Sequence, residues 1–241
     1  MKPGLAGMSV FIGLNASEEE LNLQKFNTWA FTNPKGCMEP EDFFNLSTEE
    51  VMEAKNIPLM FFAFPSAKDP RWTEQEDRKN KSTCTIVALV SWKWFEKFKD
   101  TKLKKRGEEY DEVKKVLGNI LVEQVCHLKP EIRHFIDYVD IGSPCTNLHY
   151  LAQPHGEIYG LDHSASRMDP WMSAQLRPET DIKNLYLTGQ DVLMAGFSGG
   201  LFSGLFCSAA VLKRNVMNDL KSLGEKLSLK QDTGKLATKV F

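Results

Sequence analysis

The sequence lacks several patterns that would reveal a protein's chemistry at once. Among its 16 glycines no two are separated by a single residue, so no G-x-G turn is present to hold a dinucleotide pyrophosphate. Its cysteines form no C-x-x-C pair and are odd in number, so neither a zinc site nor a disulfide framework is indicated. We expect reduced, mostly buried thiols at Cys37, Cys84, Cys126, Cys145 and Cys207.

Charge and targeting signals are also sparse. The formal net charge of −2 gives no overall field that would attract nucleic acid, and we expect no nucleic-acid partner. The first residues carry one Lys and a short apolar run broken by glycine, a pattern too brief to predict a secretory signal. His149, His155 and His163 fit no metal-ligand spacing, so we expect no metal site.

What is present is the composition of an ordinary folded protein. The chain has 241 residues, of which 42% are hydrophobic and 26% charged, enough for one large domain or two smaller units. Apolar residues at three- and four-residue steps predict an amphipathic helix over 108–128, and capping-box pairs at Ser17/Glu20 and Ser47/Glu50 predict two helix starts. The second of these opens a short helix at 51–55. β-Branched and aromatic runs predict strands at 9–14, 26–31, 57–64, 83–92, 135–141 and 184–188.

A basic segment at 92–106 interleaves aromatic residues with Lys and Arg. A helix that lies at a membrane surface has this pattern, and so does a solvated helix at the edge of a sheet. Peripheral membrane contact through 92–106 is therefore one expectation, and the solvated helix is the other.

The longest stretch without charge covers 21 residues, 192–212, and is rich in glycine. Three interpretations fit it: a membrane span, a buried core helix, or a strand, turn and helix that together bind a ligand. The third uses a strand at 184–188, the tight turn that Gly189 permits, and the carboxylate of Asp191 at the strand end. A helix at 197–215 would follow, its first amide groups left bare by glycines.

Four motifs in the second half carry a resemblance. They are GSPCTNLHYL at 142–151, YG at 159–160, QLRPETDIKNLYLTGQD at 175–191 and CSAAVLKRN at 207–215. Together they resemble the phytoene desaturase and carotenoid isomerase family of FAD-dependent oxidoreductases, most closely the members that act on retinoids. The similarity extends over about 129–220.

The resemblance implies an α/β, two-domain flavoprotein. Residues 1–175 would supply part of a substrate-binding domain, 176–222 the closing strand and helix of a Rossmann-type FAD domain, and 223–241 a polar tail. The family opens with a strand and G-x-G-x-x-G, which this sequence lacks. We therefore expect a C-terminal portion or a shortened isoform that is inactive without the missing N-terminal half.

The resemblance also implies roles for individual residues. The cofactor-binding residues would be Gly189, Gln190, Asp191, Gly196, Phe197, Ser198, Gly199 and Gly200. Tyr150 and Phe202 would line the path of the polyene, as Phe197 and Phe206 could. Tyr159 and His163 are candidates for the proton donor by residue type alone.

The implied activity is saturation of the 13,14 double bond of all-trans-retinol, or of a related polyene lipid, by FAD with NAD(P)H as an electron source. The implied location is the endoplasmic reticulum membrane. A carotenoid isomerase or desaturase is the alternative within the enzyme class. A non-catalytic polyene-binding or interaction module is the alternative outside it.

Overall fold

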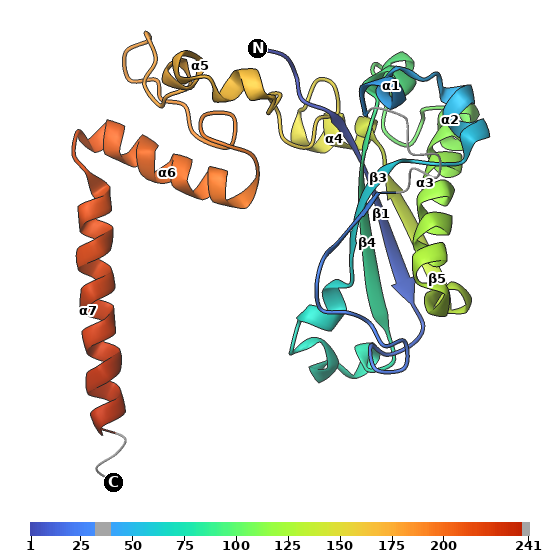
Figure 1. Cartoon of the computed structure of the whole chain (residues 1–241), viewed down its shortest axis with the longest axis horizontal. Helices are drawn as coiled ribbons and strands as arrows, with labels where there is room; N and C mark the ends of the chain where they lie inside the picture. Colours follow the sequence, from blue (N-terminus) through green and yellow to red (C-terminus); the bar gives the residue numbers. More distant parts are fainter. Residues whose placement is uncertain (32–39, 238–241) are drawn as a thin grey trace. The chain divides into compact units, whose positions relative to one another are not determined.

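The computed structural model describes residues 1–31 and 40–237, and the chain divides into two compact units (Figure 1). One unit is formed by residues 3–158, and the other by residues 1–2 together with 159–241. The fold is mixed α/β, as predicted. The assignment of a substrate domain, an FAD segment and a tail to 1–175, 176–222 and 223–241 concerns function and stays a prediction.

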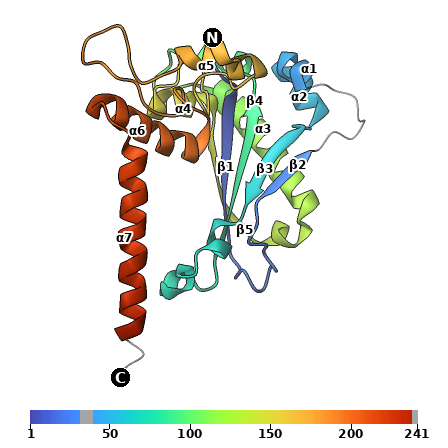
Figure 2. The same ribbon diagram turned by 60° about the vertical axis from the view of Figure 1, so that its left-hand side comes forward.

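A five-stranded antiparallel sheet forms the centre of the 3–158 unit, in the order β2-β3-β4-β1-β5 (Figures 1 and 2). Its strands are β1 Ala6–Leu14, β2 Thr28–Phe31, β3 Leu59–Ala63, β4 Ser82–Val90 and β5 Ile136–Gly142. Its helices are α1 Pro40–Asn45, α2 Thr48–Ala54, α3 Glu108–Leu128 and α4 Pro144–Leu151. Five of the six predicted strands are thereby confirmed, as is the helix at 108–128.

Helix α3 covers one face of this sheet and closes the core (Figure 1). Strand β4 alternates strictly between buried and half-buried residues, the pattern of a strand with one covered face. Leu117 and Leu121 of α3 are fully buried together with Val10 and Ile12 of β1. The 3.6-residue period of the helix and the two-residue period of the strands therefore meet in one core.

The two predicted capping boxes behave differently. At α2 the Ser47 hydroxyl accepts from the Glu50 N–H (3.2 Å), and the Glu50 carboxylate accepts from the Ser47 N–H (2.7 Å). Ser17 likewise accepts from the Glu20 N–H, but no helix follows, so that prediction is wrong. The chain instead reverses at Asn22, whose φ of 45° breaks helical geometry, and buries Leu21 and Leu23.

The segment 92–106 is not the helix that its composition predicts. It contains two single 3₁₀ turns, Trp92–Trp94 and Glu96–Phe98, followed by irregular chain. Trp94, Phe95 and Phe98 are buried, and the ring of Phe98 lies edge-on to Tyr110 with centroids 5.4 Å apart. Because these aromatic residues belong to the core, the surface of the segment is formed mainly by charged residues, the acidic Glu96 and Asp100 among them, with Trp92 half-buried.

The 159–241 unit contains α5 Pro170–Gln175, α6 Gly196–Leu212 and α7 Val216–Ala237. The strand predicted at 184–188 does not form: a single bridge joins Tyr186 to Glu179, and Leu185 and Leu187 are exposed. A strand needs a hydrogen-bonded neighbour, and the described chain supplies none here beyond that bridge. The helix predicted at 197–215 is confirmed and ends at Leu212, because Lys213 adopts a left-handed cap.

Helix α7 was not predicted, since the sequence indicated only a polar tail from residue 223. Within the described residues no single helix is long and apolar enough to cross a bilayer. Helix α6 and 216–228 of α7, bent by 116° at their junction, meet the length and composition criterion only as a pair.

The prediction of unpaired thiols is confirmed at four cysteines. Cys84, Cys126 and Cys145 are buried and Cys207 is half-buried, all of them unbridged. Burial, with a smaller contribution from neighbouring Cys126, raises the pKa of the Cys84 thiol to about 12, so this thiol is unreactive at neutral pH. Cys37 lies outside the described residues.

Candidate functional site

The candidate site lies where the loop after residue 188 enters helix α6. Gly189 has a φ of +109°, and a Cβ built there would meet no atom within 4 Å. Its N–H donates to the Ser203 hydroxyl at 2.8 Å, which ties the turn to α6 one helical turn beyond Gly199. The turn is therefore held to α6 through the Gly189 N–H, while the side of Gly189 where a side chain would lie stays open.

The start of α6 is built from glycine for two different reasons. Gly196 has a φ of +83°, and its N–H is capped by the side-chain oxygen of Gln190 at 3.1 Å. A Cβ on Gly199 would lie 1.6 Å from the carbonyl oxygen of Met194, so only glycine fits that position. A Cβ on Gly200, by contrast, would meet nothing within 4 Å, which leaves room for a ligand against the first turn.

Asp191 is held from two sides. Its Oδ1 accepts from the Leu161 N–H at 2.8 Å, and its carboxylate lies against Gly160, where a Cβ would come within 2.4 Å of Oδ1. Its own backbone carbonyl accepts from Nη2 of Arg167 at 2.7 Å. The loop at 159–168 thereby fixes the acid that the sequence singles out.

The two proton-donor candidates lie together in this loop, where the rings of Tyr159 and His163 meet edge-on with centroids 6.3 Å apart. Burial, and then the positive charge of Arg167, lowers the pKa of His163 below the ordinary histidine value of 6.5. His163 is therefore mainly neutral at pH 7 and a weak source of protons. Tyr159 is 43% exposed.

The lowered pKa of His163 predicts that the stability of the fold depends on pH. Because the folded state binds the proton less well than the unfolded chain, the free energy of unfolding should fall as the pH is lowered through 6.5. His163→Gln removes that contribution. Urea unfolding of both chains between about pH 7.5 and pH 5.5 tests this. An unchanged slope in the variant would contradict it.

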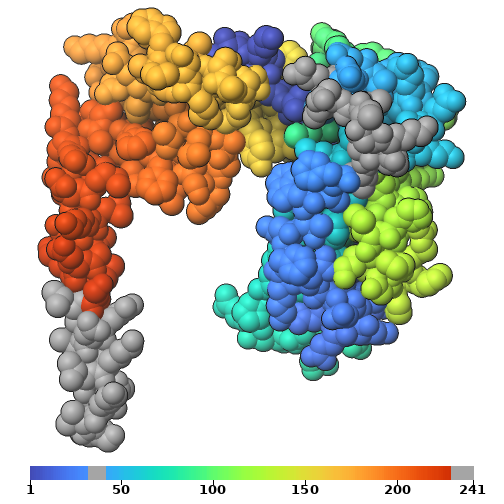
Figure 3. Space-filling model, in the orientation of Figure 1, coloured from blue at the N-terminus to red at the C-terminus, as the bar shows by residue number. Residues whose placement is uncertain are grey.

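The aromatic residues predicted for the site are exposed. Tyr150 belongs to α4, in the other compact unit, and is exposed. Phe197 is 86% exposed, and Phe202 and Phe206 are also exposed. Figure 3 shows atoms of this part of the chain, in orange, at the surface. Helix α6 is apolar on all sides but buries only Gly199 and Ser203, so the interpretation of α6 as a core helix of this chain is wrong.

Three residues of the site were not predicted from the sequence: Leu161, Arg167 and Ser203. The backbone N–H of Leu161 carries no sequence signal, and an isolated Arg gives no sign that it will be buried. Ser203 does carry a sequence signal. It stands four residues after Gly199 and so lies on the same face of α6, a spacing typical of small residues where a helix closely approaches a neighbour.

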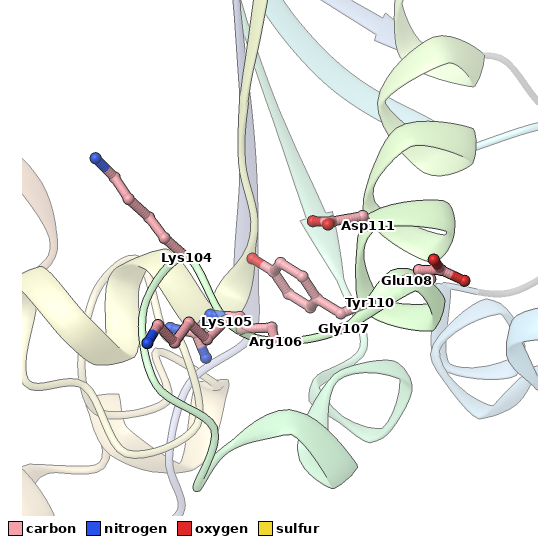
Figure 4. Close-up of a pocket in the computed structure, with 7 residues that line it drawn as sticks. All are labelled: Lys104, Lys105, Arg106, Gly107, Glu108, Tyr110 and Asp111. Atoms are coloured by element: carbon pink, nitrogen blue, oxygen red, sulfur yellow. The ribbon is translucent and has the colours of Figure 1, made fainter.

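A separate cavity of about 400 Å³ lies at the start of α3, between Lys104 and Asp111 (Figure 4). Lys104 and Lys105 extend away from the helix there. Arg106 is engaged elsewhere: it donates to the carbonyl oxygens of Phe98 and Cys145. The cavity is thus a groove beside a basic loop.

Comparison with known proteins gives one consistent result. No protein-family model matches the chain. The all-trans-retinol 13,14-reductases of Danio rerio and Homo sapiens are 41% and 40% identical to it over 94% of its length. A protein of Danio rerio named inactive all-trans-retinol 13,14-reductase is 32% identical over 95%. The chain spans 37% of the length of each of these relatives. Over nearly its whole length the chain is a homologue of one segment of the all-trans-retinol 13,14-reductases.

Proposed function

We propose that the chain forms part of an FAD-dependent oxidoreductase that saturates the 13,14 double bond of all-trans-retinol or a related polyene lipid. The observation that carries the proposal is its similarity, at 39–41% identity over 94% of its length, to proteins named for that reaction. The motif at 185–191 and the glycine-lined start of α6 support the proposal, because hydrogen bonds join them in one site.

The residues of this site fit a flavin dinucleotide. Glycine at 189 and 200 lets a planar ligand approach the backbone, and the α6 N-terminus favours electron-rich groups. Within the described residues Oδ2 of Asp191 has no hydrogen-bond partner while Oδ1 is engaged, so one oxygen is left for a sugar hydroxyl. Gln190, Phe197, Ser198 and Gly199 would complete this wall.

When bound, FAD supplies the hydride, with NAD(P)H as the source of its electrons. The chain's own residues orient the ligand, exclude water and provide a proton. The Tyr159 hydroxyl suits the last task better than His163, whose lowered pKa leaves little of its protonated form. Phe202 would line the polyene path, and the same role for Tyr150, in the 3–158 unit, stays a prediction.

Two alternatives predict different behaviour. A carotenoid isomerase or desaturase would use the same flavin segment with another redox outcome. A non-catalytic polyene-binding or interaction module is favoured by one specific observation, the similarity to a relative whose name describes it as inactive. A test must therefore separate binding from reduction.

The test uses a chimera in which this chain replaces the matched segment of the zebrafish reductase. After anaerobic prereduction, the purified chimera is given all-trans-retinol in a single turnover. Reduction removes one conjugated double bond, so the product should absorb at shorter wavelength. A geometric isomer would contradict the proposed reaction, and an unchanged substrate bound to a flavin-loaded chimera would favour the non-catalytic module.

The 241-residue chain alone is the control for cofactor binding. We propose that FAD retention needs a G-x-G-x-x-G motif in addition to this chain, which contains none. The purified chain should therefore carry no flavin absorbance. Flavin that remains with it through gel filtration would refute this requirement.

A membrane location, at the endoplasmic reticulum, is part of the proposal, because a retinoid partitions into bilayers. The exposed lysines of 92–106 are the candidate contact, since three of the four aromatic residues of that segment are buried. Reversing the charge of Lys102, Lys104 and Lys105 should weaken binding to anionic liposomes by about tenfold or more. Reversal of Lys114 and Lys115 on α3 is the control, and equal binding by both variants would rule out this surface.

A further inference from the structure

Arg167 is the most deeply buried cation among those residues of the 159–241 unit whose burial the structure describes. Only 4% of its surface is exposed, although it lies in a short 3₁₀ turn, Ala165–Met168. Within the described residues it forms no ion pair, and its Nη1 has no hydrogen-bond partner. A buried guanidinium without an acidic partner is costly to the fold, so its remaining contacts call for an explanation.

Those contacts all converge on the proposed cofactor turn. Nη2 of Arg167 donates to the carbonyl oxygens of Gln190 (3.0 Å) and Asp191 (2.7 Å). The side chains of these two residues make hydrogen bonds of their own. The Gln190 oxygen accepts from the Gly196 N–H, and the Asp191 carboxylate accepts from the Leu161 N–H. One guanidinium nitrogen thus holds the backbone from which both side chains project.

We infer that Arg167 is a positioning residue, which holds the Gln190–Asp191 backbone so that the Asp191 carboxylate keeps one oxygen on Leu161 and turns the other toward the cofactor. The inference rests on the proposed function for its purpose, but the positioning itself is a property of the chain alone. Charge-assisted hydrogen bonds to two successive carbonyls are stronger and more directional than neutral ones, which suits this task.

The first test needs no cofactor. In Arg167→Met the Asp191 carboxylate should no longer be held against the Leu161 N–H, so this amide should exchange with solvent about tenfold faster or more. Hydrogen exchange is measured by NMR on the 241-residue chain, with the α6 amide of Cys207 as the internal reference. Arg167→Lys should restore part of this protection. Arg177→Met, at an exposed Arg of the same unit, is the matched control. Unchanged exchange at Leu161 in Arg167→Met would overturn the inference.

The second test asks whether Arg167 acts through Asp191. In the chimera, Arg167→Met and Asp191→Asn should each weaken FAD binding by about tenfold, and the double variant should be scarcely weaker than either one, because both changes remove the same contact. Multiplicative losses would overturn the inference. If the unmutated chimera failed to bind FAD, the proposed function would fall, while the exchange experiment would still decide the role of Arg167.

Discussion

Replacing Gly199 with alanine is expected to lower the free energy of unfolding of the 159–241 unit by about 3 kcal/mol. The added Cβ would lie 1.6 Å from the carbonyl oxygen of Met194, and a backbone atom cannot move aside as a flexible side chain can. The start of α6 must shift, and the Ser203 hydroxyl must then lose its hold on the Gly189 N–H. Urea unfolding followed through the α6 amide signals measures the loss.

Gly200→Ala is the matched control, one residue further along the same helix. No atom lies within 4 Å of the added Cβ, and alanine favours the helix by about 1 kcal/mol over glycine, so the variant should be as stable as the parent or more so. Equal destabilisation by the two substitutions would show that the close approach at Met194 does not limit this position.

The second large effect concerns the other unit. Leu121 is fully buried in the layer between α3 and the sheet, so Leu121→Ala should cost about 3 kcal/mol from lost apolar contact and the cavity left behind. The matched control is Leu128→Ala at the exposed end of the same helix. Chemical denaturation monitored by tryptophan fluorescence reports on this unit, since four of the five tryptophans lie in it.

A loss at Leu128 as large as that at Leu121 would contradict the assignment of the core. Because the two units are compact separately, Leu121→Ala should leave the α6 amide signals in place at urea concentrations where the sheet has unfolded. Simultaneous loss of both sets of signals would show that the units unfold together.

Periodicity accounts for most of what the sequence predicted correctly. Helix α3 and strand β4 have their apolar residues at helical and two-residue spacing, and each buries the face that this spacing indicates. Local chemistry alone was less reliable. Ser47 and Glu50 start a helix, whereas Ser17 and Glu20 do not, because the backbone turns left-handed at Asn22.

The candidate site, too, was predicted from the sequence only in part. Gly189 and Asp191 were predicted from their place after an apolar run, and the structure joins this turn to α6 through Ser203 and Gly196. The prediction of a strand at 184–188 was wrong. A strand needs a neighbouring strand to pair its hydrogen bonds, and whether such a neighbour exists depends on the tertiary structure.

The amino-acid sequence by itself determined where five strands, α3 and α6 form, that the start of α6 is rich in glycine, and which family the chain resembles. These follow from interactions between residues a few positions apart, or from similarity along the chain. Only the tertiary structure decided that Trp94, Phe95 and Phe98 are buried, that Arg167 hydrogen-bonds the Gln190–Asp191 backbone, and that α6 stays largely exposed. Each of these depends on contacts between segments distant in sequence, whose energies no local pattern records.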